Sequence, residues 1–156
     1  MSSYLMPVLE MAAPTLEWRA LAPVLLVFAA ACLGILLEAV LPRRLRFVAQ
    51  TTLVIAAGVA SLAFLVINWR AGYAGRLAMG SIMLDGPTYF AWGALLVFGV
   101  LAFMVFAERS LNGGATTFAA SAASVPGSAD EAESSAARHE HTEVFPLGLF
   151  ALTGMM

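Results

Sequence analysis

The stretch from Ala20 to Leu41, ALAPVLLVFAAACLGILLEAVL, decides the fold of this chain. It carries a single charged residue, Glu38. As an α-helix with a rise of about 1.5 Å per residue, the stretch would be about 33 Å long, enough to cross a bilayer core of about 30 Å. The sequence therefore predicts a transmembrane helix over residues 20–41.

A second apolar run, from Val48 to Ile67, follows after a short basic segment that contains Arg43, Arg44 and Arg46. Two spans joined by so short a segment predict a transmembrane hairpin. Arginines in a loop between spans are retained on the cytoplasmic side of the membrane. We therefore expect these three arginines to determine the topology in the cell membrane, with the N-terminus outside.

The chain as a whole is expected to be an all-α, polytopic membrane protein with three complete transmembrane helices and the start of a fourth. The expected segments are an outer-side leader over 1–19, spans over 20–41, 48–68 and 88–107, a cytoplasmic loop over 42–47, an outer-side loop over 69–87, a disordered cytoplasmic linker over 108–144 and a truncated fourth span over 145–156. Aromatic residues prefer the membrane interface. Those expected at the outer interface are Trp18, Trp69, Tyr73, Tyr89 and Trp92.

The composition supports a membrane protein. The chain is 61% hydrophobic and 12% charged, whereas a soluble domain carries about 25% charged residues. A net charge of −2 offers no basic surface for nucleic acid. The single cysteine, Cys32, excludes an internal disulfide and a cysteine metal cluster. A cleaved signal ending at Cys32 is disfavoured, because apolar residues follow it and no basic start precedes the run.

The last third of the chain changes character. Residues 111–144 are rich in alanine and serine, acidic, and without a sustained apolar period, which predicts the disordered linker. A new apolar run, FPLGLFALTGMM, then occupies residues 145–156. A spanning helix needs about 20 residues, so we expect this run to be the beginning of a fourth span and the chain to be an N-terminal fragment.

Small residues on the first two spans predict helix packing. Ala30, Gly34 and Glu38 recur every four residues and share one face of the first span. The second span has two such pairs, Ala56 with Ala60 and Ala57 with Ser61. Small residues on one face let another helix approach closely. Pro23 is expected in the first turn of the first span, where its missing N–H costs little.

The outer loop contains two local signals. Residues 77–84, LAMGSIML, are apolar but too short to span, which predicts a small extended piece on the outer surface. Asp85-Gly86-Pro87 predicts a helix start, because Asp85 can accept hydrogen bonds from free N–H groups and proline is favoured in the first turn.

Few residues could carry chemistry. Glu38 is a weak catalytic candidate, because an ionisable group within a span often marks an ion or proton path. Its position near the helix end favours a structural role, in which it reaches the interface or meets Arg43 or Arg44. His139-Glu140-His141 with Glu143 has donor atoms suited to a transition metal, but a solvated linker is the favoured interpretation, and no metal site is predicted. Cys32 is interpreted as a packing residue.

The order of these features resembles the N-terminal part of NADH-quinone oxidoreductase subunit N, an antiporter-like membrane subunit of bacterial respiratory complex I. Each segment that carries the resemblance is a weak signal alone, and the order and spacing of the segments make the case. They are residues 21–23, 36–44, 49–50, 82–85, 107–110, 142–147 and 154–156. The long linker, rich in alanine and serine, resembles the actinobacterial form of this subunit.

The resemblance implies a subunit of a translocase that couples electron transfer from NADH to quinone, with menaquinone expected, to proton transport. It implies no cofactor bound by this chain, because NADH, FMN, iron–sulfur clusters and quinone are used in other subunits. The implied partners are the other membrane subunits and the lipid bilayer. The family's pumping glutamate and lysine residues lie in later helices, so none is carried over to this chain, which has no lysine.

Two alternatives from other classes remain open at this point. One is a subunit of a multi-subunit cation/proton antiporter, which shares the antiporter-like fold. The other is a small non-catalytic membrane protein that packs against a larger partner. In all three cases this chain alone is expected not to be catalytic, because three spans with one carboxylate near an edge cannot relay protons across about 30 Å of hydrocarbon.

Overall fold

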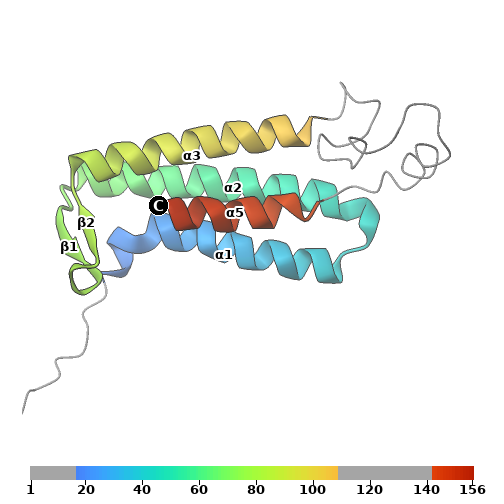
Figure 1. The fold of residues 1–156 in the computed structure, drawn as a ribbon, viewed down its shortest axis with the longest axis horizontal. Helices are drawn as coiled ribbons and strands as arrows, with labels where there is room; N and C mark the ends of the chain where they lie inside the picture. Colours follow the sequence, from blue (N-terminus) through green and yellow to red (C-terminus); the bar gives the residue numbers. More distant parts are fainter. Residues whose placement is uncertain (1–16, 109–141) are drawn as a thin grey trace, which may run out of the picture.

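The computed structural model describes residues 17–108 and 142–156. These residues form four α-helices, a short 3₁₀ turn and a two-stranded hairpin (Figure 1). In chain order the elements are α1 (Trp18–Val40), α2 (Arg43–Arg70), β1 (Gly75–Leu77), η1 (Ala78–Gly80), β2 (Ile82–Leu84), α3 (Gly86–Ala107) and α5 (Val144–Met155). The expected linker over 108–144 lies almost entirely outside the described residues.

Three of the helices, α1, α2 and α3, are long and apolar enough to cross a membrane, and α5 is a shorter apolar helix. They lie side by side along the long axis of the molecule, with the hairpin at one end (Figure 1). The helix α5 packs mainly on α1 and also contacts α2 and α3. The expected fold class is confirmed, because the protein is helical, with three membrane-capable helices and a short helix after them.

The turn between α1 and α2 is tighter than expected. Leu41 has an extended backbone, as the residue before a proline prefers, and α1 therefore ends at Val40. Pro42 occupies the N-cap position of α2, which begins directly at Arg43. The segment 42–47, expected as a loop, is therefore helical from Arg43 onward. A helix can extend beyond the hydrocarbon core, so the expected membrane boundaries of the second span remain a prediction.

Glycines allow the close approach of the helices. A Cβ atom at Gly34 would lie 3.0 Å from Cβ of Pro146, so the small-residue face of α1 is the face that receives α5. A Cβ atom at Gly58 would lie 2.3 Å from Cγ2 of Val100, closer than any real contact, so α2 and α3 touch at this glycine. Of the two small-residue pairs expected on α2, Ala57 and Ser61 are buried in the bundle.

Two polar side chains of α2 hold the first half of α1. Pro23 lies more than one turn inside α1, later than expected, because the helix begins at Trp18. Since proline has no N–H, the carbonyl of Arg19 loses its usual partner four residues on. Asn68 supplies the missing donor: its Nδ2 atom donates to the Arg19 carbonyl oxygen at 2.8 Å. The buried hydroxyl of Ser61 donates to the carbonyl oxygen of Pro23 at 2.7 Å.

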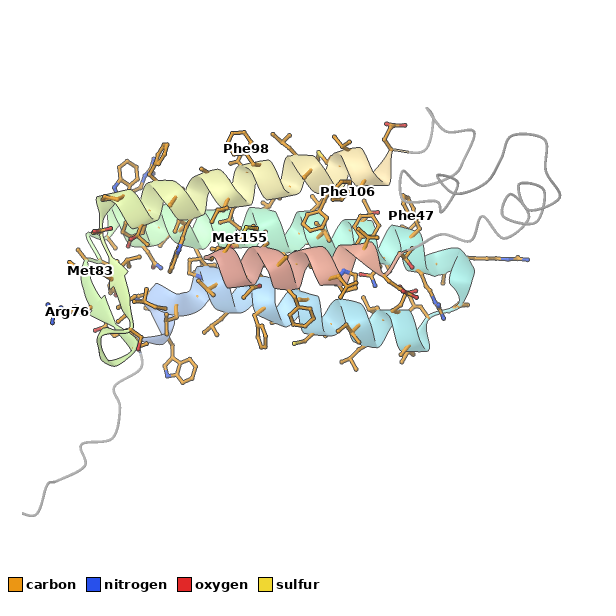
Figure 2. The ribbon with its side chains drawn as sticks, in the orientation of Figure 1. Phe47, Arg76, Met83, Phe98, Phe106 and Met155 are labelled. Carbon is orange, nitrogen blue, oxygen red and sulfur yellow. The ribbon has the colours of Figure 1, made fainter. Side chains whose placement is uncertain are left out.

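The outer-loop segment forms the antiparallel hairpin β1–β2, with Leu77 opposite Ile82. Its turn uses left-handed backbone at Ala78 and Gly80, with φ of 47° and 89°. Leu77 and Leu84 are buried and close this end of the core, whereas the side chains of Arg76 and Met83 point away from the helices (Figure 2). The prediction of a short extended piece is confirmed.

The start of α3 is capped as the sequence predicts. Oδ1 of Asp85 accepts hydrogen bonds from the hydroxyl of Thr88 at 2.7 Å and from its backbone N–H at 2.9 Å. These bonds, chiefly the one from the hydroxyl, hold the pKa of Asp85 below its ordinary value of 3.8. The cap therefore stabilises the folded protein fully above that value, and its contribution is lost as the pH falls through the lowered pKa.

Candidate functional site

Glu38 is the centre of a polar cluster at the end of the bundle opposite the hairpin. It lies in the last turn of α1, and only 17% of its side chain is exposed. Its Oε1 atom lies 3.1 Å from Nη1 of Arg46, which forms an ion pair with it. The Nε atom of Arg46 also donates to the carbonyl oxygen of Leu41 at 2.7 Å, so the guanidinium bridges the carboxylate and the end of α1.

The ion-pair partner of Glu38 is Arg46. Arg43 or Arg44 was expected in this place, and for Arg44 the expectation was wrong, because its side chain is exposed. Because α2 begins at Arg43, residues 44 and 46 are both helical. Their side chains are therefore separated by about 200° around the helix axis. Arg46 and Gln50, one turn apart, share the face that is turned toward α1. The register of α2 therefore selects the partner.

Gln50 lies fully inside the bundle, with no exposed surface. Its Nε2 atom donates to the carbonyl oxygen of Gly34 at 2.7 Å and to Oε2 of Glu38 at 3.2 Å. Both partners are acceptors, which fixes the orientation of the amide. Its Oε1 atom has no hydrogen-bond partner among the described residues and lies on the glycine face, 3.1 Å from where a Cβ of Gly34 would be.

The fourth member of the cluster is Thr142, two residues before α5 begins. Its hydroxyl lies 2.8 Å from both Oε1 and Oε2 of Glu38, and only 1% of the residue is exposed. The cluster therefore joins three parts of the chain: the end of α1, the first turns of α2 and the entry to α5.

The carboxyl group of Glu38 is surrounded by hydrogen-bond donors. A carboxylate accepts several hydrogen bonds at once, and Glu38 receives donors from Arg46, Gln50 and Thr142. A paired and hydrogen-bonded charge is the form that a protein interior tolerates. The arrangement is therefore that of an interhelical connection.

The other candidates have simpler places. Residues 139–141 lie outside the described residues, and Glu143 is exposed just before α5. Within the described ranges, 17–108 and 142–156, no group of three or more histidine, cysteine, aspartate or glutamate side chains could hold a metal ion. Cys32 is half-buried in the middle of α1.

The aromatic residues mostly gather near the hairpin end. Trp18 and Trp69 are 64% and 63% exposed, at the start of α1 and the end of α2. Tyr89 donates its hydroxyl to the carbonyl oxygen of Tyr73 at 2.8 Å. Trp92 is buried inside the bundle, with 3% of the residue exposed. The position of these aromatic residues at the membrane interface remains a prediction.

Gln50 and Thr142 were not singled out as site residues from the sequence. The signal for Gln50 was available, because it is a polar side chain one turn beyond Arg46 at the start of an apolar run. Nothing local marks Thr142, since its role depends on how α5 packs against α1.

Comparison with known proteins identifies the family. No protein-family model matches the chain. A protein from a Nocardioides species named NADH-quinone oxidoreductase subunit N is 42% identical over 92% of this chain. A Streptomyces griseus protein named NADH-quinone oxidoreductase subunit N 3 is 43% identical over 92% of it, and a Cutibacterium acnes subunit N is 41% identical over 99%. The chain belongs to the NADH-quinone oxidoreductase subunit N family.

The family assignment confirms the resemblance seen in the sequence, including its actinobacterial character. The chain spans only 28% of the length of the Nocardioides and Streptomyces relatives and 29% of the Cutibacterium relative. Together with three membrane-capable helices, membership makes this a multi-pass membrane protein.

Proposed function

We propose that this chain forms a membrane-embedded part of a proton-translocating NADH-quinone oxidoreductase. In the complex, electrons pass from NADH to a quinone, with menaquinone as the expected acceptor, and the membrane subunits move protons. The observation that carries the proposal is the identity of 41–43% to subunit N proteins over nearly the whole chain. The three helices long enough to cross a membrane support a membrane position.

Within that function, the segment supports the bundle and does not itself relay protons. Among the described residues, Glu38 is the only carboxylate that lies within α1, α2, α3 or α5. It is held by Arg46, Gln50 and Thr142 close to one end. A relay across about 30 Å of hydrocarbon needs several ionisable groups or waters in sequence. The proposed partners of this segment are the remaining helices of the subunit, neighbouring membrane subunits and lipid.

A chimeric subunit tests this proposal. The segment of the Streptomyces griseus relative that aligns with this chain is replaced by residues 1–156, in a strain that lacks the native subunit. We expect the complex to assemble, and membrane vesicles to show NADH–menaquinone activity with proton uptake. Gly58→Leu in the same chimera is the control, because it removes the close approach of α2 and α3 and should prevent assembly.

The two other classes of function give different outcomes. A subunit of a cation/proton antiporter would leave NADH oxidation unrestored while vesicles exchange sodium for protons without NADH. A small non-catalytic packing protein would neither assemble with the complex nor restore either activity. Either result would contradict the proposal.

A further inference from the structure

An apolar groove lies between α2 and α3 in the half of the bundle nearer the hairpin. Its volume is about 760 Å³, which is within the range of about 300–1,000 Å³ typical of ligand sites. The lining is apolar and aromatic, and includes Leu65, Trp69, Tyr89, Phe90, Gly93 and Phe98. The groove is separate from the Glu38 cluster, which lies at the opposite end of the bundle.

Small residues of α3 make the hollow. Gly93 and Ala94 lie between the bulkier residues Phe90 and Phe98 along the helix. A Cβ atom at Gly93 would stand 3.6 Å from Cδ2 of Leu65, an ordinary contact distance, so a methyl group would fit there and a larger side chain would extend into the groove. Phe90 and Phe98 are 79% and 69% exposed and flank the hollow. Figure 2 shows Phe98 near the middle of α3, pointing away from the bundle.

The length of the groove indicates its occupant. It extends along α3 from Gly86 at the helix start to Phe98. At about 1.5 Å per residue this is about 18 Å, close to the depth of one leaflet, which is about half of a 30 Å bilayer core. A packed transmembrane helix would contact both leaflets. A groove that begins at a helix end and stops near mid-helix fits one acyl chain instead.

The mouth of the groove fits a lipid headgroup. Trp69 and Tyr89 line it at the helix ends, where amphipathic rings meet headgroups. Arg70 follows Trp69 with an exposed side chain, and no described carboxylate lies within ion-pair distance of it. The carboxylate of Asp85, directly before α3, accepts hydrogen bonds from the hydroxyl and the backbone N–H of Thr88. A phosphate at this level would therefore meet a guanidinium that has no carboxylate partner among the described residues.

We propose that this groove binds one acyl chain of a phospholipid from the leaflet at the hairpin end, with the lipid phosphate paired to Arg70. The inference does not depend on the proposed respiratory function, because it rests on the shape and charge of α2 and α3 alone.

Lipid retention tests the proposal. The 156-residue chain is purified from vesicles of phosphatidylglycerol and phosphatidylethanolamine into mild detergent, and bound phosphatidylglycerol is measured by native mass spectrometry. We expect one retained lipid. Gly93→Leu, which fills the groove, should weaken retention about tenfold, the loss expected when about two buried methylene groups lose their contacts. Arg70→Gln should weaken retention of phosphatidylglycerol as well.

The matched control is Ala91→Leu, an exposed position on the same helix that does not line the groove. It should retain lipid like the wild type. Ala94→Leu provides a second filling of the groove if Gly93→Leu does not give a helical, monodisperse protein. Equal retention by the wild type and both filled variants would overturn the proposal.

A photoreactive phosphatidylglycerol with a diazirine on one acyl chain locates the site in the chimeric complex. We expect adducts on residues 62–69 and 86–98. Absence of these adducts in the complex, with adducts present in the isolated chain, would show that a protein helix covers the groove and would also overturn the proposal.

Discussion

The hydroxyl oxygen of Thr142 lies 2.8 Å from each carboxylate oxygen of Glu38, although 104 positions of sequence separate the two residues. Contacts along the helices complete the docking of α5: Pro146 packs on Gly34, and the ring of Phe150 meets that of Phe28 edge-on at 5.8 Å. The short helix is therefore held at its start by hydrogen bonds to a charged group and along its length by close packing.

Thr142→Val should loosen α5. The variant keeps the shape of the side chain and removes the hydroxyl, which leaves Glu38 with two donors and costs about 1–3 kcal/mol. The measurement is the rate of disulfide formation between cysteines at positions 28 and 150, in a Cys32→Ser background. We expect slower cross-linking in Thr142→Val. Thr142→Ser, which retains a hydroxyl, is the control, and equal rates in all three proteins would exclude the role of this hydroxyl.

Glu38→Gln should leave most NADH-driven proton pumping intact in the assembled chimeric complex. The carboxylate is committed to three donors near one end of the bundle, and the amide still accepts from Thr142 through its oxygen. Pumping is measured in membrane vesicles and normalised to the amount of assembled complex. Near-total loss of pumping with normal assembly would show that Glu38 carries obligatory proton transfer.

Asn68 and Pro23 should be energetically coupled. Asn68→Ala leaves the Arg19 carbonyl without a partner and is expected to destabilise the chain by about 1–3 kcal/mol. In a Pro23→Ala background, residue 23 supplies an N–H to that carbonyl, so the same change should cost clearly less. Thermal unfolding of the four proteins in one detergent gives the double-mutant cycle. If the destabilising effects of the two mutations were additive, the Asn68 amide would not be acting in place of the N–H that Pro23 lacks.

Gly58→Ala should destabilise the packing of α2 on α3. The new Cβ would meet Cγ2 of Val100 at 2.3 Å, and overpacking of this kind costs about 1–3 kcal/mol. Val100→Ala removes the clashing methyl group and should restore stability to the double variant. Gly154→Ala is the control, because nothing lies within 4 Å of its Cβ position. A Gly58→Ala protein as stable as this control would contradict the contact.

The topology predicted from the arginines can be tested by labelling. Residues 43–46 and 111–144 should face the cytoplasm, and residues 1–19 and 70–87 should face outward. Single cysteines are placed in each segment of a Cys32→Ser chain and exposed to a membrane-impermeant maleimide on intact spheroplasts. Labelling from outside at any position of 111–144 would reverse the orientation.

The sequence was sufficient for the elements whose cause is local. An apolar run of bilayer length predicted a helix over 20–41, and the structure has it at Trp18–Val40. Asp85 was predicted as a cap because its partner, Thr88, is only three residues away. Gly34 was recognised as part of a small-residue face, which is the face that α5 covers.

The polar cluster could not be predicted in full, because its contacts join distant parts of the chain. The choice of Arg46 depends on the start of α2 at Arg43, and an expected loop over 42–47 concealed that register. Thr142 reaches Glu38 only because α5 runs antiparallel to α1 and begins beside the end of α1. The burial of Trp92 likewise depends on the rotation of α3 against its neighbours, which an aromatic residue near a helix start does not reveal.

The two-residue turn at Leu41 and Pro42 has a consequence for biogenesis. With so little chain between them, α1 and α2 cannot enter the bilayer one after the other as independent units, because either helix draws the other to the same boundary. We therefore expect the translocon to receive them as a paired hairpin, in which Gln50 can donate to the Gly34 carbonyl before the pair reaches the lipid. This hydrogen bond would lower the cost of placing the amide of Gln50 in hydrocarbon.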